Sequence, residues 1–187
     1  MTIIGAAGVV TVDNVPAGDP LRQKNSQQYG FQFGVNASPL SPVFRISTRI
    51  LAPFSGVTTE PHQSMGLFIG TGDQDNYLKL VTKNNGIQIF SEIDAEPYQE
   101  AIVAQQYTDV DYVDLILEID PGSAIATGYY KVSSGGQTTT ETMVASFDFP
   151  ATWLTAPTKL AIGIISTEVD IIPVSYTHLT LPTILLV

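Results

Sequence analysis

The sequence contains no cysteine, which excludes disulfide bonds, thiolate metal sites and cysteine nucleophiles. Basic residues are scarce as well, because 8 Lys and Arg stand against 18 Asp and Glu, giving a net charge of -10. Such a charge repels phosphate backbones and anionic membranes, so it argues against nucleic-acid binding and favours cations as small partners. No apolar run reaches the roughly 18 residues of a membrane span, so membrane insertion is not expected. The first residues also lack the basic leader of a secretory signal.

The residues that are present suit one folded domain. The chain has 187 residues, of which 44% are hydrophobic and 14% charged. Domains typically hold roughly 100 to 200 residues, so one core is expected. The apolar content is high enough to build that core, and the charge is too low for a disordered chain.

Alternation of apolar and polar residues indicates strands. Phe44, Ile46 and Ile50 alternate with polar residues, which is the period-2 pattern of a half-buried strand. Runs of the same character cover residues 31–35, 65–70, 78–80, 87–90, 113–119, 125–132, 143–149 and 160–166. Glycine, proline and asparagine turns separate these runs. Only residues 98–107 allow a helix, and Ile102 and Val103 allow a strand there equally well. The pattern predicts an all-β, antiparallel two-sheet β-sandwich of the jelly-roll type.

The last residues have a different character. Residues 174–183 read VSYTHLTLPT, and this string resembles the translation of a transposase adapter used in preparing DNA sequencing libraries. Pro173 fits the same adapter reading. We therefore expect residues 173–187 to be a non-native tail and residues 1–172 to be a single β-sandwich module, truncated as a metagenomic fragment. A native strand is the alternative. A foreign tail is expected to pack poorly, at a sheet edge or in solvent.

Five phrases in order carry a resemblance to a known superfamily: VFRISTRILAPF, MGLFIGTGDQDNYLKLV, GIQIFSEID, DYVDLILEID and KLAIGII. They resemble the concanavalin A-like lectin/glucanase superfamily, and within it the laminin-G-like modules of large secreted bacterial and archaeal surface proteins. The resemblance implies a concanavalin A-like sandwich that binds carbohydrate or mediates adhesion without catalysis. It also implies an extracellular or cell-surface location, beside neighbouring domains of a larger chain.

One short motif raises the question of catalysis. Glu92, Asp94 and Glu96 resemble the E-x-D-x-E signature of laminarinase-type glycoside hydrolases, in which the first Glu is the nucleophile and the last is the acid/base. On a single strand the three carboxylates would share one face and could line a cleft. Pro97 argues against this geometry, because proline does not continue a central strand. The motif's alternative interpretation, a solvated acidic strand end, is preferred.

Another acidic segment is a candidate cation site. Asp73, Asp75 and Asn76 offer oxygen ligands at the spacing of a calcium loop, and calcium is the one cofactor that the sequence suggests. The alternative is an ordinary hairpin connection in which the same side chains bind their own backbone.

The expected function is a non-catalytic carbohydrate-binding or adhesion module, with a glycan or cell-surface polysaccharide as partner. Tyr77, Tyr98 and Tyr107 are the candidate ligand-binding residues, because an aromatic ring offers an apolar surface with a polar tip to a sugar. A retaining β-glucanase using Glu92 and Glu96 is the first alternative, and a structural spacer domain is the second. The sole tryptophan, Trp153, lies far downstream of the acidic motif, which speaks against the enzyme.

Overall fold

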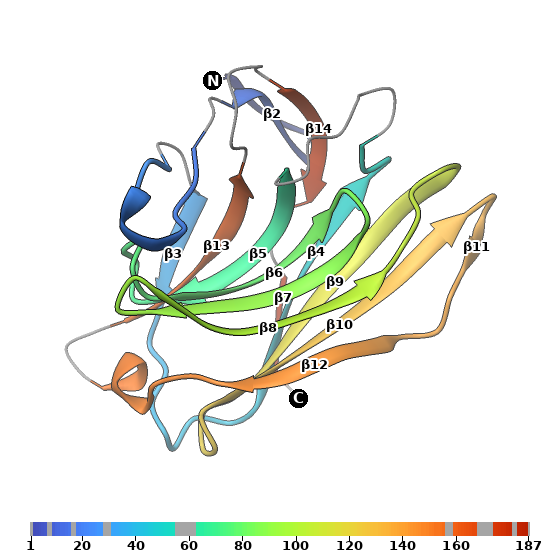
Figure 1. The fold of residues 1–187 in the computed structure, drawn as a ribbon. Helices are drawn as coiled ribbons and strands as arrows, with labels where there is room; N and C mark the ends of the chain where they lie inside the picture. The colour runs from blue at the N-terminus through green and yellow to red at the C-terminus, as the bar shows by residue number, and fades with distance from the viewer. Residues whose placement is uncertain are drawn as a thin grey trace.

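A computed structural model describes residues 2–6, 9–15, 18–27, 31–54, 63–155, 159–167, 174–180 and 183–186. Side chains are described for residues 18–27, 31–54, 63–155 and 159–167. Two antiparallel sheets packed face to face dominate this part of the chain (Figure 1). The predicted all-β sandwich is therefore confirmed.

The first sheet, called the small sheet below, has 6 strands in the order β3-β13-β5-β6-β7-β8. Their bounds are β3 (Phe31–Val35), β5 (Ser64–Gly70), β6 (Tyr77–Lys83), β7 (Gly86–Ile93), β8 (Glu96–Ala104) and β13 (Leu160–Thr167). Tight hairpins join β6 to β7 and β7 to β8, as the pairs of Lys83 with Gly86 and Ile93 with Glu96 show. Residues 98–107, which allowed a helix or a strand, contribute most of β8.

The second sheet, called the large sheet, has 9 strands. Its path runs β1-β2-β14-β4-β9-β10-β11, while β12 pairs with β10 and β15 pairs with β4. The bounds are β1 (Thr2–Ala6), β2 (Val9–Val15), β4 (Phe44–Leu51), β9 (Val110–Asp120), β10 (Ile125–Ser134), β11 (Gln137–Thr138), β12 (Thr142–Asp148), β14 (Val174–Thr180) and β15 (Thr183–Leu186). Two short 3₁₀ turns complete the elements, η1 (Arg22–Lys24) and η2 (Ala151–Leu154).

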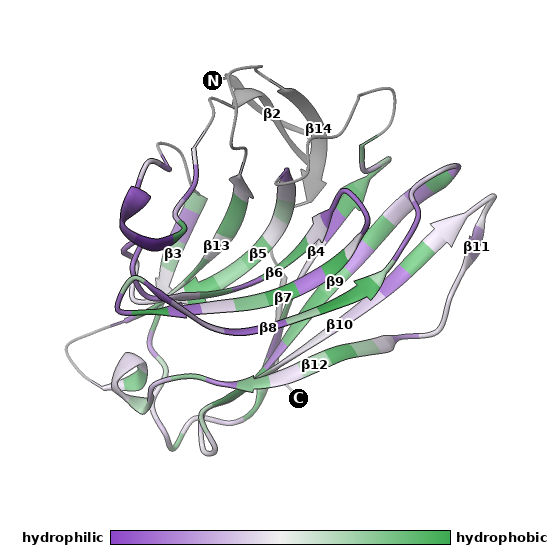
Figure 2. Ribbon diagram, viewed as in Figure 1, coloured by the Kyte–Doolittle hydropathy of each residue, from purple (hydrophilic) through white to green (hydrophobic). Residues whose placement is uncertain are grey.

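Alternating burial explains how the sheets meet. Strand β4 buries Phe44, Ile46, Thr48 and Ile50 and leaves the intervening residues partly exposed, because successive side chains of a strand point to opposite faces. Leu, Ile, Val and Phe side chains of both sheets fill the space between them. The small-sheet strands β5, β6 and β7 are buried on both faces, so their outer face is covered as well. Figure 2 shows this hydrophobic character along the strands and the strongly hydrophilic segment around η1.

Trp153 belongs to this core. It lies in η2 with 2% of its surface exposed and stacks on Phe149 at a ring distance of 5.7 Å. The ring therefore packs at one end of the sandwich.

The C-terminal strands take part in the large sheet. Strand β14 pairs with β2 on one side and meets β4 at Leu179 and Ile50 on the other, and β15 pairs with β4. The expectation that this segment lies at a sheet edge or in solvent is thus wrong for the backbone of β14, because this strand pairs with β2 on one side and with β4 on the other. The non-native origin of residues 173–187 stays a prediction.

Candidate functional site

The outer face of the small sheet, turned away from the main core, carries an unusual set of buried polar side chains. In β6, Leu78 and Leu80 point into the main core, so Tyr77, Lys79 and Val81 point to the outer face. Strand β7 continues this face, because Glu92, Phe90 and Gln88 stand opposite Tyr77, Lys79 and Val81 in that order. All six of these outer-face side chains are buried.

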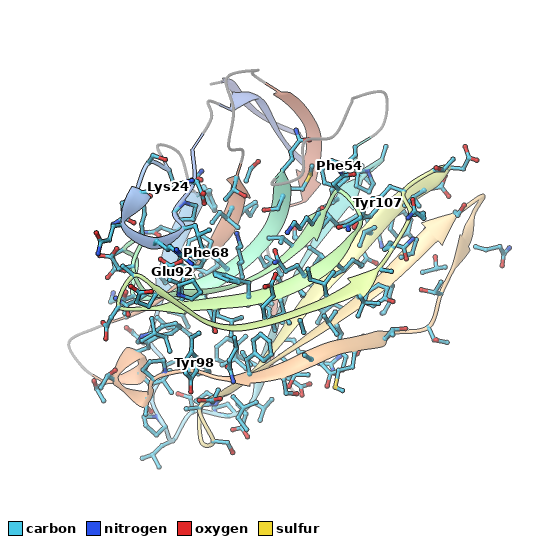
Figure 3. All side chains as sticks on the ribbon, in the orientation of Figure 1. Lys24, Phe54, Phe68, Glu92, Tyr98 and Tyr107 are labelled. Atoms are coloured by element: carbon cyan, nitrogen blue, oxygen red, sulfur yellow. The ribbon has the colours of Figure 1, made fainter. Side chains whose placement is uncertain are left out.

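Their burial has two sources. A second, smaller apolar cluster lies on this face, made of Phe68, Val81, Ala161 and Ile165. The segment of residues 18–27 also lies against it. Figure 3 shows Lys24 of this segment above Phe68 and Glu92, at one end of the small sheet.

Hydrogen bonds fix the segment to the sheet and its loops. The Arg22 backbone N–H donates to Glu92 Oε1 at 2.8 Å. Gln27 and Gln74 are joined twice, through the Gln27 N–H to Gln74 Oε1 at 2.9 Å and Gln74 Nε2 to the Gln27 carbonyl at 3.1 Å. The Asn25 amide donates to Asp75 Oδ1 at 2.6 Å. These contacts hold the segment as a wall on the outer face.

Between this wall and strands β6 to β8 lies a cavity of about 360 Å³, called the Lys79 pocket. It falls in the range of small-ligand sites, about 300 to 1,000 Å³. The lining residues are Asp19, Leu21, Arg22, Ser64, Lys79, Lys83, Gln88, Phe90, Pro97, Glu100 and Thr167. A second hollow of about 240 Å³ follows along the segment, beside Phe68 and Tyr77. One apolar ring and many hydrogen-bonding groups therefore meet in one pocket.

Lys79 is the most unusual residue of the pocket. Only 8% of its surface is exposed, and its Nζ lies 5.9 Å from the centre of the Tyr77 ring and 5.5 Å from that of Phe90. Burial lowers the pKa of its ammonium group to about 8. Because burying an unpaired charge lowers stability, a buried lysine at this position calls for a functional reason.

Glu92 lies next to the pocket, fully buried. Besides the Arg22 N–H, it accepts a hydrogen bond from the Tyr77 hydroxyl to Oε2 at 3.3 Å. Burial raises the pKa of the Glu92 carboxyl, while these hydrogen bonds and Lys79 oppose that shift. Burial also raises the pKa of Tyr77, which stays neutral. Both Glu92 oxygens thus serve to hold the Arg22 backbone and the Tyr77 ring.

The E-x-D-x-E motif does not lie on one strand, so its carboxylates lack the alignment that the glucanase alternative requires. The preferred interpretation, a solvated acidic strand end, is wrong for Glu92, which is fully buried. Asp94 and Ala95 have φ angles of 53° and 62°, and they form the tight turn that joins β7 to β8. Glu92 pairs with Pro97, whereas Glu96 pairs with Ile93, the neighbour of Glu92. Paired residues share a face, so Glu92 and Glu96 point to opposite faces of the hairpin.

The candidate tyrosines lie in three separate places. Tyr77 is buried on the outer face. Tyr98 is 53% exposed at the edge of the small sheet, where its hydroxyl donates to Asp148 Oδ2 at 3.1 Å. Tyr107 lies at the other end of the sandwich, near Phe54, and donates to the Gly86 carbonyl (Figure 3). They do not form one stacking platform.

The Asp73 loop satisfies its own polar groups. Asp73 Oδ1 accepts the backbone N–H groups of Asp75 and Asn76 at 2.9 and 2.8 Å, and Oδ2 accepts the Thr71 hydroxyl at 2.7 Å. Asn76 Oδ1 accepts the Asp94 N–H at 3.1 Å, which ties the loop to the β7–β8 turn. Among the described residues, no group of three or more His, Asp or Glu is arranged to hold a metal ion. This geometry is that of a hairpin connection, and calcium binding stays a prediction.

Sequence reasoning missed Lys79, Gln88, Phe90 and Glu100. A usable signal was present, because Lys79 interrupts an otherwise apolar stretch between Tyr77 and Val81. His62 lies outside the described residues.

No family model and no curated protein matches the chain. Solved structures do match. Lectin II from Ulex europaeus has a TM-score of 0.58 at 9% identity, over 97% of this chain and 88% of its own. Lectin I-B4 from Griffonia simplicifolia has 0.55 at 10%, over 98% and 91%. The chain has a lectin-like β-sandwich fold.

Glycoside hydrolase proteins share the fold as well. A bifunctional GH43-CE protein of Bacteroides eggerthii matches with a TM-score of 0.63 at 15% identity, over 96% of this chain. The chain spans 22% of that protein and 38% of a GH43 protein from Bacillus licheniformis, which matches with a TM-score of 0.59 at 9% identity. Identities this low establish the fold alone. Among the described residues, no helix is long and apolar enough to cross a membrane.

Proposed function

We propose that this chain is a non-catalytic carbohydrate-binding module and that it binds its glycan in the Lys79 pocket. The observation that carries the proposal is the lining of the pocket. Sugars present hydroxyl groups around an apolar ring face, and the pocket offers Phe90 beside the hydroxyls of Ser64 and Thr167, the Gln88 amide and charged groups. The likeness of the fold to two plant lectins supports the same function.

The arrangement of the acidic motif supports binding without hydrolysis. A retaining glycosidase needs two carboxyl groups about 5 to 5.5 Å apart, facing the same sugar. Glu92 is fully buried and bonded to Arg22 and Tyr77, and Glu96 points to the opposite face of the hairpin. Their orientation disfavours cooperation on one glycosidic bond.

The wider setting is part of the proposal. A laminin-G-like module that adheres to cell-surface polysaccharide, outside the cell and beside other domains, agrees with the superfamily resemblance of the sequence. The matched GH43 proteins support a partnership with other domains, because the chain spans only part of their length.

The test is a glycan array carrying neutral and acidic glycans, probed with the wild-type chain and with Gln88→Ala. Gln137→Ala is the matched control, because Gln137 is exposed in β11 of the large sheet. We expect the wild type and the control to bind the same glycans and Gln88→Ala to bind them at least several-fold more weakly. Absence of binding to any glycan by the folded wild type would leave the structural spacer.

Catalysis is tested on the same proteins. The chain is incubated with β-1,3- and β-1,4-glucans and galactans, and reducing ends are measured. We expect none above the blank. Reducing-end release that disappears in Glu92→Gln would establish the glucanase alternative and overturn the proposal.

A further inference from the structure

Basic residues are unevenly distributed over the molecule. The chain has 8 Lys and Arg, and Arg22, Lys79 and Lys83 all line the Lys79 pocket. Within the described residues, their charged groups make no ion pair and no hydrogen bond. Lys79 is more than nine-tenths buried, so its only route to a partner is through the pocket.

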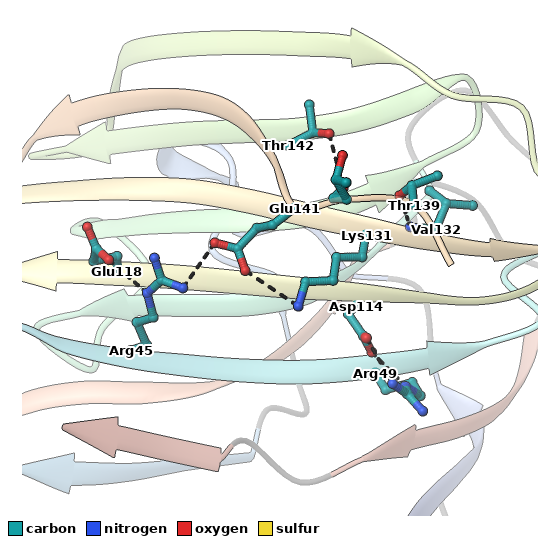
Figure 4. A network of polar contacts seen from close by, with 10 residues as sticks. Arg45, Arg49, Asp114, Glu118, Lys131, Val132, Thr139, Glu141 and Thr142 are labelled. Atoms are coloured by element: carbon teal, nitrogen blue, oxygen red, sulfur yellow. Dashed lines mark hydrogen bonds and ion pairs between the residues drawn. The ribbon is translucent and has the colours of Figure 1, made fainter. Parts of the chain in front are cut away.

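On the outer face of the large sheet, by contrast, the basic residues form ion pairs. Arg45 pairs with Glu118 at 2.7 Å and with Glu141 at 3.0 Å, and Lys131 pairs with Glu141 at 3.5 Å (Figure 4). Arg49 makes two bonds to Asp114, at 2.6 and 2.8 Å. Pairing is therefore the rule on that face. Of the four cations without an ion pair among the described residues, three line the pocket, and the fourth is the exposed Lys159.

The acidic groups around Lys79 are already engaged. Asp19 accepts the Leu21 N–H at 2.9 Å and lies 3.5 Å from Lys24 Nζ. Glu100 accepts the Gln88 amide at 2.5 Å. Glu92 holds Arg22 and Tyr77, as described above. The groups left without partners in the pocket are thus cationic donors, and a complementary ligand would bring an anionic acceptor.

We propose that the Lys79 pocket selects an acidic sugar, a uronic acid whose carboxylate accepts a hydrogen bond from Lys79 Nζ. The inference rests on the proposed carbohydrate-binding function and names its ligand class. Lys83 and Arg22 line the same pocket and add positive charge, while Phe90 offers the sugar ring an apolar surface. Asp19, Glu92 and Glu100 attract the Lys79 ammonium group from a distance, but no described residue forms an ion pair with it, so pairing with the sugar carboxylate would further compensate its burial.

The test is calorimetric titration of the full chain at pH 7 with trigalacturonate, with the neutral trimer galactotriose, and with a sulfated galactotriose. The variants are Lys79→Met and Lys83→Gln, and Lys131→Met is the matched control on the large sheet. Far-UV circular dichroism verifies that each variant is folded. Lys83→Gln keeps the experiment informative if Lys79→Met does not fold, because Lys83 is partly exposed.

We expect trigalacturonate to bind the wild type about tenfold or more tightly than galactotriose, as a charge-assisted hydrogen bond implies. Lys79→Met should remove that preference, Lys83→Gln should reduce it several-fold, and Lys131→Met should leave it unchanged. Equal affinity for the acidic and neutral trimers, or a preference for the sulfated trimer over trigalacturonate, would overturn the inference while the carbohydrate-binding function stands. If no glycan of the array binds either, the proposed function fails with it.

Discussion

The two outer faces of the sandwich use charge in opposite ways. On the large sheet, Arg45, Arg49 and Lys131 are partly exposed, and each has an acidic partner (Figure 4). Arg49 also stacks on Tyr112, with its guanidinium carbon 3.7 Å from the ring centre. On the small sheet, Lys79 is buried beside the Tyr77 and Phe90 rings and forms no ion pair with any described residue.

This difference separates stability from binding. Exposed ion pairs contribute about 0.2 to 1 kcal/mol each, so the large sheet gains modestly from its network. A buried unpaired cation lowers the free energy of unfolding, because its hydration is lost without replacement. In our account, the small sheet retains this unfavourable group because a ligand uses it.

The largest expected effect is a loss of stability on adding a methyl group at Gly163, on the outer face of the small sheet. A Cβ added at Gly163 would lie 2.5 Å from the Phe68 ring and against the Phe31 carbonyl. Gly163→Ala should therefore lower the free energy of unfolding by about 1 to 3 kcal/mol, as overpacking does. Chemical denaturation measures it, with Gly122→Ala as the control, because the nearest atom there is a side-chain oxygen of Asp120 at 3.3 Å. Equal stability of the two variants would show that Phe68 and the Phe31 backbone pack less tightly against Gly163 than these distances indicate.

The second prediction compares the change in stability when one cation is removed from each outer face. Arg49→Met removes the bonds to Asp114 and the stacking on Tyr112, and should cost about 1 kcal/mol, or roughly 2 to 4 °C in melting temperature. Lys79→Met removes an unpaired buried charge and should leave the melting temperature unchanged or raise it. A Lys79→Met variant less stable than Arg49→Met would mean that Lys79 has a structural role.

The sequence predicted the sandwich because apolar alternation and turn residues are local signals. The strands from Phe44 to Thr167 follow them closely, and an asparagine turn at Asn84 and Asn85 separates the predicted runs 78–80 and 87–90. Pro97 argued correctly against one continuous strand through the acidic motif, but the tight turn within the motif was not predicted. Asp94 and Ala95 adopt positive φ angles, and an alanine gives no hint of a turn that normally favours glycine or asparagine.

The pocket was beyond local reasoning because it is built from distant segments. Residues 18–27 cover strands more than fifty positions downstream, through bonds such as that from Arg22 to Glu92. No periodicity within either segment records this contact. Lys79 alone was detectable, as a charge inside an apolar strand, but its role depends on the neighbours that the fold brings.

The pH dependence of stability and of ligand affinity should distinguish the two effects of Lys79, destabilising the fold and binding the ligand. Its pKa is about 8 in the folded chain against an ordinary value of 10.5, so above pH 8 the unfolded chain binds more protons and stability rises with pH. Affinity for trigalacturonate should fall over the same range, because the ammonium group loses its proton. The charged or titratable groups around it are Asp19, Arg22, Tyr77, Lys83, Glu92 and Glu100.

Thermal melts and titrations of the wild type and Lys79→Met, from pH 7 to about 9.5, measure both trends. In Lys79→Met the two trends should be absent or much reduced. Parallel changes of stability and affinity with pH in the wild type would contradict the assignment to Lys79.

Removing residues 173–187 tests whether the stability of the large sheet depends on this last segment. Strand β15 pairs with β4 at Ser47 and Arg45, within the charged network. From the predicted non-native origin of the segment, we expect the melting temperature to change by only about 1 to 2 °C. A loss of several degrees would show that the segment is an integral part of the large sheet.

Calcium should have the smallest effect. Because both Asp73 oxygens already accept hydrogen bonds from within the loop, we expect a titration to millimolar calcium, followed by EDTA, to shift the melting temperature by less than about 1 °C. A larger, EDTA-reversible shift that Asp75→Ala abolishes would establish the calcium site.

Ligand binding in the Lys79 pocket is tested most directly by an amide NMR titration of the ¹⁵N-labelled chain with trigalacturonate. We expect chemical-shift changes at residues 19–22 and at Lys79, Gln88 and Phe90 of the small sheet. The amides of Arg45, Arg49 and Lys131 on the large sheet should be unaffected. Changes concentrated on the large sheet, or their absence at saturating ligand, would contradict binding in this pocket.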